Sequence, residues 1–421
     1  MKPAAIALPV LTLLACGIWL GSQHRSISAL EQQSAVLKKR IAAHDATPLA
    51  VSAGASQAPR EKKGVKPVRE KTDWKGVADE LVAIQRQGGV SNMRTMLRFQ
   101  QKIQEMTADE LVAALDEIAA LDLPKESVAM LEQAIIGPLA KKDPEMALNR
   151  FADRLNERNG MLGWALSEGM KEWCKKDTAA ATAWLDQQIA GGKFDSKSLD
   201  GKSPSRSMFE GQVIIALLAK DPDAASVRLA TLPESQRQEA MRIVSSPLKE
   251  EQQVAFANMA REHLPEEEQT TTLAQVASQI ASTRDYADVS SYIERISATP
   301  EERTAIVTAA ASDKLRSLSY NEKITQEQVD QMRDWALSNS ANDANKITGK
   351  ALAQVADYQN PNNNFNDLAD LAVHYHEASG NDEVMTSFLQ NSYLADKEKA
   401  RELAEKISDP QRREEILKRY K

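Results

Sequence analysis

Four segments of this chain begin with a basic residue followed by aspartate, in a context that predicts the start of a helix. They are Lys142-Asp143-Pro144, Lys176-Asp177-Thr178, Lys220-Asp221-Pro222 and Arg284-Asp285-Tyr286, and a fifth, weaker copy, Ala395-Asp396-Lys397, lacks the basic residue. An aspartate before a helix accepts a hydrogen bond from a backbone N–H that has no partner within the helix, and proline is tolerated at the next position. A recurring helix start predicts a recurring structural unit.

The residues that follow each aspartate also recur. Four residues on lie Ala147, Ala181, Ala225, Val289 and Ala400, and eight residues on lie Phe151, Leu185, Leu229, Ile293 and Ala404. Positions four residues apart share one face of a helix. We therefore expect a small residue that lets a neighbouring helix approach, followed in all copies but the last by a larger residue that fills the groove beyond it.

The spacing of the aspartates predicts units of about 34 residues, a length that suits two helices and two turns. The interval from Asp143 to Asp177 is one such unit, whereas the interval from Asp177 to Asp221 is longer, and a Gly/Ser/Lys-rich insertion at 191–207 accounts for the excess. The interval from Asp221 to Asp285 is close to two units, and that from Asp285 to Asp396 is close to three. A unit of two helices buries its faces only against stacked neighbours, so we predict an all-α fold, an α-solenoid of stacked helical hairpins over residues 74–421.

Composition agrees with this fold class. Aromatic residues make up 5% of the 421 residues, and from Trp74 onward the hydrophobic residues follow helical periodicity, which predicts about twenty helices and no strand. Thr107-Ala108-Asp109-Glu110 has the pattern of a capping box. Residues 1–73 hold 11 basic and 5 acidic residues, so they carry +6 of a total of −7 and the remainder carries −13. Because phosphate binding needs clustered basic residues, we expect no nucleic-acid partner.

The N-terminal segment, residues 1–21, predicts export. An uncharged, mostly apolar run extends from Ala4 to Leu20 and is near the lower limit for crossing a bilayer. Three interpretations remain open: an uncleaved signal anchor, a lipoprotein signal in which Leu13-Leu14-Ala15-Cys16 is the lipobox and Cys16 is lipidated, and a cleaved secretory peptide. Each places the body on the periplasmic side of a bacterial cell envelope, although the basic residues from Arg25 to Arg40 do not fit the usual charge asymmetry.

Residues 22–73 separate this leader from the repeats. Within the amphipathic segment 22–42, the apolar positions between Ile27 and Ile41 alternate at three and four residues, which predicts either a simple stalk helix or a weak homodimer through residues 27–41. Residues 43–73 contain three prolines and a basic cluster, and we expect a disordered linker. This linker either acts as a tether or also contacts anionic envelope polymers or lipid headgroups.

Two resemblances follow from these patterns. In unit length and alanine pattern the body is similar to tetratricopeptide-like α-solenoids, although the Trp-Leu-Gly-Tyr set of that repeat is missing. An exported leader followed by degenerate Lys-Asp-Pro-x-x-Ala hairpins with tryptophans near their ends also resembles the uncharacterised helical-repeat proteins of verrucomicrobial and planctomycete bacteria, over about residues 75–420. The resemblance implies a helical-repeat fold, and it supplies no catalytic residues.

The sequence offers little evidence of catalytic or metal chemistry. Histidines two apart, as in His374-Tyr375-His376, point away from each other on a helix, so we expect no metal site. Ser246-Pro247-Leu248-Lys249 matches the nucleophile motif of penicillin-interacting serine enzymes, but the companion Lys-Thr-Gly is absent, and we interpret the match as chance. Cys174 is expected to be a buried apolar residue. No cofactor is expected.

Three tryptophans, Trp164, Trp173 and Trp184, lie close together in the sequence. Core packing explains such a cluster, and an aromatic patch that binds a partner is the alternative. From this architecture we expect a non-enzymatic, envelope-tethered scaffold that binds a protein or peptide partner. The alternative function is an α-helical enzyme of carbohydrate or peptidoglycan metabolism with a carboxylate pair in a concave groove.

Overall fold

The computed structural model describes residues 72–87, 90–155, 160–195, 202–246, 248–356, 362–393 and 395–421. The chain divides into two compact units, Met1–Lys71 and Thr72–Lys421, and the described residues belong to the second. The predicted anchor with Cys16, the stalk with its 27–41 seam and nearly all of the linker therefore lie outside the described residues. No helix among the described residues is long and apolar enough to cross a membrane.

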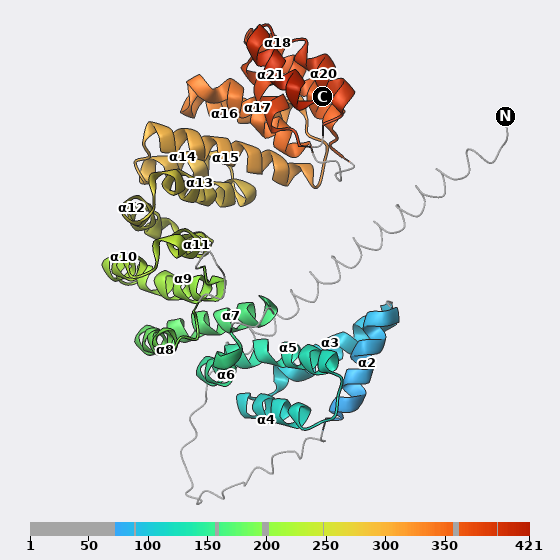
Figure 1. The fold of residues 1–421 in the computed structure, drawn as a ribbon, viewed down its shortest axis with the longest axis vertical. Coiled ribbons are helices and arrows are strands. Elements are labelled where there is room, and N and C mark those ends of the chain that lie inside the picture. The colour runs from blue at the N-terminus through green and yellow to red at the C-terminus, as the bar shows by residue number, and fades with distance from the viewer. Residues whose placement is uncertain are drawn as a thin grey trace, which may run out of the picture. The chain divides into compact units, whose positions relative to one another are not determined.

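The described residues are all-helical, as predicted, and form twenty α-helices, three short 3-10 helices and no strand (Figure 1). The first ten α-helices are α2 (Trp74–Gln87), α3 (Val90–Glu105), α4 (Ala108–Ala119), α5 (Lys125–Lys142), α6 (Pro144–Phe151), α7 (Gly160–Lys176), α8 (Thr178–Ala190), α9 (Pro204–Leu218), α10 (Pro222–Ala230) and α11 (Glu234–Ser245). The next ten are α12 (Gln253–His263), α13 (Glu266–Thr283), α14 (Tyr286–Arg295), α15 (Pro300–Ser319), α16 (Gln326–Asn339), α17 (Ala344–Val355), α18 (Phe365–Ser379), α19 (Glu383–Asn391), α20 (Lys397–Ala404) and α21 (Pro410–Arg419). The 3-10 helices are η1 (Ala152–Arg154), η2 (Glu250–Gln252) and η3 (Ala341–Asp343).

From α3 onward the helices form two layers of stacked hairpins. Each odd-numbered helix from α3 to α19 contacts the next odd-numbered helix, and we call this series the odd layer. Each even-numbered helix from α6 to α20 contacts the odd helices before and after it in the chain, and these helices, with α4, form the even layer. Because every hairpin buries one face against the next, the hydrophobic core lies between the two layers.

The recurring aspartates begin even-layer helices, as the spacing predicts. Asp143, Asp177 and Asp221 precede α6, α8 and α10, and each carboxylate accepts a backbone N–H bond three residues on. Asp396 caps α20 in the same way. Asp285 precedes α14 but makes no side-chain capping bond, so the copy that looks stronger in the sequence is the weaker cap. The interval from Asp221 to Asp285 contains one further even-layer helix, α12, and the interval from Asp285 to Asp396 contains two, α16 and α18. These three helices start without an aspartate cap.

The predicted packing positions are buried in every copy. The residues four and eight positions after the aspartates are each no more than 3% exposed: Ala147, Ala181, Ala225, Val289, Ala400, Phe151, Leu185, Leu229, Ile293 and Ala404. The predicted capping box at Thr107 and Glu110 is present at the start of α4. Helical periodicity and cap chemistry are local properties, which is why the sequence predicts them well.

In the four copies that have one, the basic residue of the motif reaches back about one repeat, a role that local sequence patterns do not reveal. Lys142 donates to the Gln104 carbonyl at 2.7 Å and Lys176 to the Lys142 carbonyl at 3.3 Å, both near the C-terminal ends of odd helices. Lys220 and Arg284 likewise bind Thr178 Oγ1 at 3.0 Å and Glu250 Oε1 at 2.8 Å. A cation at the C-terminal end of a helix is stabilised by the helix dipole. In the three Lys-Asp copies the motif therefore caps its own helix and links it to the preceding unit, whereas the Arg284-Asp285 copy provides the link without the cap.

The two kinds of aspartate predict different mutational effects. Asp177→Ala removes a capping bond from α8 and should lower the free energy of unfolding by about 1 kcal/mol, whereas Asp285→Ala removes none and should change it by less than about 0.5 kcal/mol. Urea titrations followed by circular dichroism measure both values. Equal costs at the two positions would contradict the assignment.

The expected insertion at 191–207 is in part ordered structure. Phe194 is 2% exposed and packs against Phe209, with ring centroids 5.3 Å apart. Ser203 caps α9, which begins at Pro204, so the end of the expected insertion is helical. Residues 196–201 lie outside the described residues. The Gly/Ser/Lys-rich composition therefore predicted more irregular structure than this segment has, because Ser203-Pro204 begins a helix.

Candidate partner-binding surface

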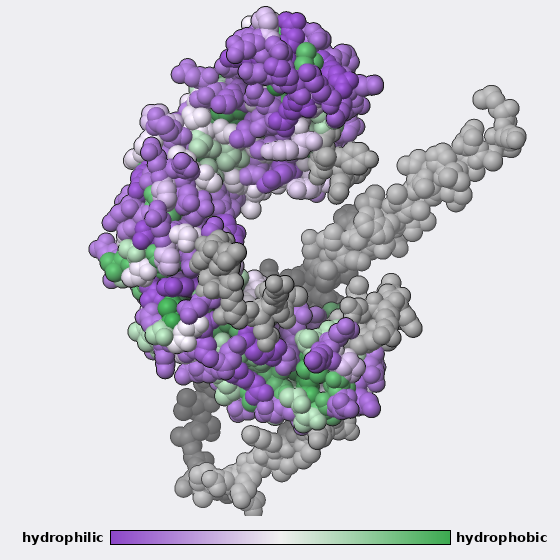
Figure 2. Space-filling view, viewed as in Figure 1, coloured by the Kyte–Doolittle hydropathy of each residue, from purple (hydrophilic) through white to green (hydrophobic). Residues whose placement is uncertain are grey.

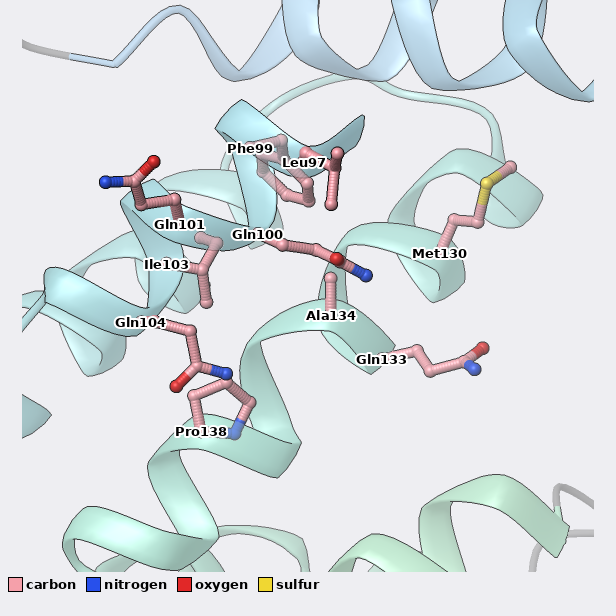
Figure 3. Close-up of a pocket in the computed structure, with 10 residues that line it drawn as sticks. All are labelled: Leu97, Phe99, Gln100, Gln101, Ile103, Gln104, Met130, Gln133, Ala134 and Pro138. Carbon is pink, nitrogen blue, oxygen red and sulfur yellow. The ribbon is translucent and has the colours of Figure 1, made fainter. Parts of the chain in front are cut away.

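A groove of about 740 Å³ lies between α3 and α5 (Figure 3). Its lining comprises Leu97, Phe99, Gln100, Gln101, Ile103 and Gln104 from α3, and Met130, Gln133, Ala134 and Pro138 from α5. Ile103 and Phe99 are buried, whereas Leu97 is 57% exposed. Figure 3 shows Gln100 extending toward Ala134 and Gln104 lying beside Pro138. The groove has an apolar floor with amide groups along its walls.

The lining carries no charged side chain, although 27% of the residues in this chain are charged. In the view of Figure 2, hydrophobic residues gather over α4 and α5, whereas the end formed by α18–α21 is mostly hydrophilic. Ile416 is the one buried residue of α21, so this helix is polar over most of its surface. Exposed apolar patches bounded by polar groups are typical of interaction sites.

Pro138 lies inside α5 and changes the backbone of the groove. Proline has no N–H, so the Ala134 carbonyl, which also lies at the groove, lacks its usual intrahelical donor. Gly137 lies between these residues on the same face, and a Cβ atom added there would meet nothing within 4 Å. Gly163 in α7 is open in the same way, whereas Gly169 in that helix is covered: an added Cβ there would lie 3.0 Å from Cβ of Ala140 in α5.

The surface continues onto α7, the next helix of the odd layer. Gln133 lines the groove and also a smaller hollow between α5 and α7, which Leu162 and Ala165 border. Trp164, next to Ala165, is 62% exposed, and the same face of α7 continues with the half-buried Glu168 and Lys171, which form an ion pair. We refer to the groove and Trp164 together as the α3–α5–α7 surface.

The structure separates the three tryptophans that the sequence singles out. Trp173 and Trp184 are 8% and 7% exposed, and their ring centroids lie 6.0 Å apart in the core. Trp184 donates to Asn149 Oδ1 at 2.7 Å, which joins α8 to α6. Burial of this pair agrees with the core-packing interpretation, and Trp164 alone of the three presents an exposed ring. The sequence cannot distinguish these roles because all three residues lie on helices with strong apolar patterns.

The buried carboxylates of the described residues are Glu210 and Glu302, in α9 and α15, and each is paired with an arginine. Burial raises the pKa of Glu210, and the hydrogen bond from Arg228 at 2.7 Å opposes this effect. The pKa of Glu302 is lowered, chiefly by its hydrogen bonds from Arg261. Arginine pairing and separation on different helices are typical of structural ion pairs rather than of a glycosidase acid/base pair.

A Ser–His contact joins α10 and α12. Ser226 Oγ lies 2.6 Å from His263 Nε2, and Glu262 Oε2 lies 3.7 Å from the same nitrogen. A catalytic triad instead places its carboxylate on the other ring nitrogen. Ser246 and Lys249 of the chance motif lie at the turn from α11 to η2, among helices. The geometry therefore gives no catalytic triad at Ser226, whereas Ser246 and Lys249 line one hollow of about 780 Å³ beside α13.

The two histidines of His374-Tyr375-His376 point apart, as expected. His374 contacts Gln326 at 3.0 Å, and His376 contacts the Asn381 carbonyl at 3.0 Å. Among the described residues, no group of three or more histidine, cysteine, aspartate or glutamate side chains could hold a metal ion.

Cys174 is buried at 1% exposure, as predicted, and burial raises the pKa of its thiol to about 12. Because the thiolate is the reactive form, alkylation at pH 7 should be roughly a thousandfold slower in the native protein than in denatured protein. Iodoacetamide labelling followed by peptide mass spectrometry measures Cys174 separately from Cys16. Comparable native and denatured rates would show that α7 opens readily.

Comparisons with known protein families, with curated protein sequences and with solved structures found no match to this chain.

Proposed function

We propose that this protein is a non-enzymatic, envelope-tethered helical-repeat scaffold that binds a protein partner through the α3–α5–α7 surface. The membrane tether is inferred from the apolar run of residues 4–20. The observation that carries the binding role is an uncharged groove of about 740 Å³ with an apolar floor between α3 and α5; α7, the next helix of the odd layer, carries the exposed Trp164. Aromatic and apolar anchors of this kind dominate the energetics of protein interfaces.

Hollows in the odd layer support it as the binding side. Side-chain hydrogen bonds join each successive pair of even-layer helices from α4 to α18, through Arg150–Asp116, Trp184–Asn149, Arg228–Asp186, Ser226–His263, Arg295–Gln253, Trp335–Ser290 and Tyr375–Asp330. In the odd layer, hollows open at α3–α5 and again across α13, α15 and α17, where the volume is about 480 Å³. Side-chain hydrogen bonds also join odd helices, as between α3 and α5 and between α5 and α7, so the hollows, and not a lack of such bonds, favour the odd layer as the side that accepts a partner.

Site-specific crosslinking in intact cells tests this function. A photo-crosslinking phenylalanine analogue replaces Leu97 of α3, and in a matched control it replaces Val227 of α10, which is 67% exposed in the even layer. Irradiation should yield a protein adduct at position 97 and none above background at position 227. Trp164→Ala should lower the yield at position 97, because a tryptophan that anchors an interface often contributes about 2 kcal/mol or more. No adduct at position 97, or equal adducts at both positions, would contradict the proposal.

A further inference from the structure

The α3–α5 groove has a length that suits a short helix. Its walls run from Leu97 to Gln104 on α3 and from Met130 to Pro138 on α5. At a rise of about 1.5 Å per residue, the wall along α5 spans about 12 Å, or roughly two helical turns. A helix seated there would place apolar residues at i, i+3 or i+4, and i+7 into the groove.

The chemistry of the groove lining limits which helices could bind there. Charged residues on the seated face would be desolvated without a partner, because the lining carries no opposite charge. The side-chain amides of Gln100 and Gln104 make no hydrogen bond to other described residues, so they can pair with polar groups at the edge of an uncharged helix. The Ala134 carbonyl, which Pro138 deprives of its usual donor, accepts a hydrogen bond from a seated hydroxyl or amide.

Glycines elsewhere in the odd layer show how closely a neighbouring helix can approach where a side chain is absent. Gly349 in α17 packs against the backbone of α19, and Gly169 in α7 packs against Ala140 in α5. Gly137 is half-buried on the face of α5 that carries Ala134 and Pro138, and nothing lies within 4 Å of the position of its absent Cβ. The approach that neighbouring helices use elsewhere in the layer is therefore open at the groove.

We propose that the α3–α5 groove binds one uncharged amphipathic helix of a protein partner, about two turns long, whose seated face carries apolar residues and one hydroxyl or amide donor. This inference rests on the proposed function and specifies the partner segment. Because the seated face is neutral, its affinity should change less than about twofold between about 50 and about 500 mM NaCl, since salt screens interactions between charges.

The adducts captured at position 97 test this inference separately from the function. Tandem mass spectrometry of the crosslinked peptide identifies the partner segment, which should show apolar residues at helical spacing, a serine, threonine, asparagine or glutamine among them, and no charge on that face. A charged segment, or one with alternating strand periodicity, would overturn the helix inference and leave the scaffold function standing. The absence of any adduct would overturn both.

Two variants of Gly137 in the full-length chain provide the second measurement. The probe is a fluorescein-labelled helical peptide, four turns long, with leucines at i, i+4 and i+7, serine at i+3 and alanine and glutamine elsewhere, compared with a scrambled peptide of the same composition. Gly137→Leu should weaken binding of the helical peptide at least tenfold, whereas Gly137→Ala should change it less than threefold. Because an added Cβ meets nothing, both variants should fold at least as stably as the native chain. Equal binding of the scrambled peptide, or no effect of Gly137→Leu, would overturn the inference.

Discussion

Gly349→Ala should destabilise the protein by roughly 3 kcal/mol or more, because an added methyl group would collide with the backbone of the neighbouring helix. The Cβ atom at Gly349 would lie 2.2 Å from the Val384 carbonyl oxygen and 2.9 Å from the Phe388 nitrogen of α19. Backbone atoms cannot move aside as a flexible side chain can, so α17 and α19 would have to separate. Their separation would expose Leu352 and Phe388, which are fully buried.

Gly137→Ala is the matched control for this substitution. Gly137 also lies inside a helix, but its added Cβ meets nothing within 4 Å, so the same change should stabilise α5 by about 0.5–1 kcal/mol through helix propensity. Urea denaturation gives both values, and hydrogen exchange should show lost protection in α17 and α19 for Gly349→Ala alone. If the two variants change stability in the same direction, the close approach of α17 and α19 is not as described.

The pair of glycines shows where sequence reasoning ends. Helix starts, the buried positions four and eight residues on, and the unit length were predictable because each depends on residues within about two helical turns. Whether a glycine such as Gly349 or Gly137 faces a neighbouring helix or solvent depends on residues about one unit away in the chain. The groove was missed for the same reason, since its leucine, methionine and alanine residues have the pattern of an ordinary core face.

The polar loop before α18 gives a second example. Its run of asparagines predicts a turn between repeats, and Asn364 does cap α18. Asn363, however, is fully buried: its amide donates to the Ser319 and Glu322 carbonyls at 3.1 and 2.8 Å, and its side-chain oxygen accepts from Ile324 N at 2.7 Å. These partners lie about one unit back in the chain, so the local composition gives no sign of the role. The different exposure of Trp164 and Trp173 has the same cause, because it depends on helices that lie far away in the sequence.

Glu302→Gln should lower the free energy of unfolding by about 2–3 kcal/mol at pH 7, because it removes one charge from a largely buried ion pair. Glu302 accepts from Arg261 Nε at 2.8 Å and from Arg261 Nη2 at 2.7 Å, and it also closes the capping box of α15 by accepting from Thr299 N at 2.9 Å. The neutral amide cannot accept both arginine bonds with equal strength. Arg261, which joins α12 to α15, would then remain partly buried without a counter-charge.

The free-energy cost of Glu302→Gln should depend on pH, and the pKa of Glu302 determines the direction of this dependence. That pKa is lowered in the folded protein, first by the hydrogen bonds from Arg261 and then by the backbone bond from Thr299. The stabilisation is therefore complete above the ordinary glutamate pKa of about 4.3 and is lost as the pH falls through the lowered folded value. The difference between the native chain and Glu302→Gln should shrink steadily from pH 5 to pH 3.

Urea titrations at pH 7, 5, 4 and 3 measure this difference. Glu301→Gln is the matched control, because Glu301 lies in the same first turn of α15 but is exposed, and its replacement should cost less than about 0.5 kcal/mol at pH 7. A cost for Glu302→Gln that stays constant or grows on acidification would show that shape, not charge, stabilises the contact between α12 and α15. A free-energy cost of Glu302→Gln that decreases as the pH is lowered would identify this ion pair as an acid-sensitive link between successive hairpins.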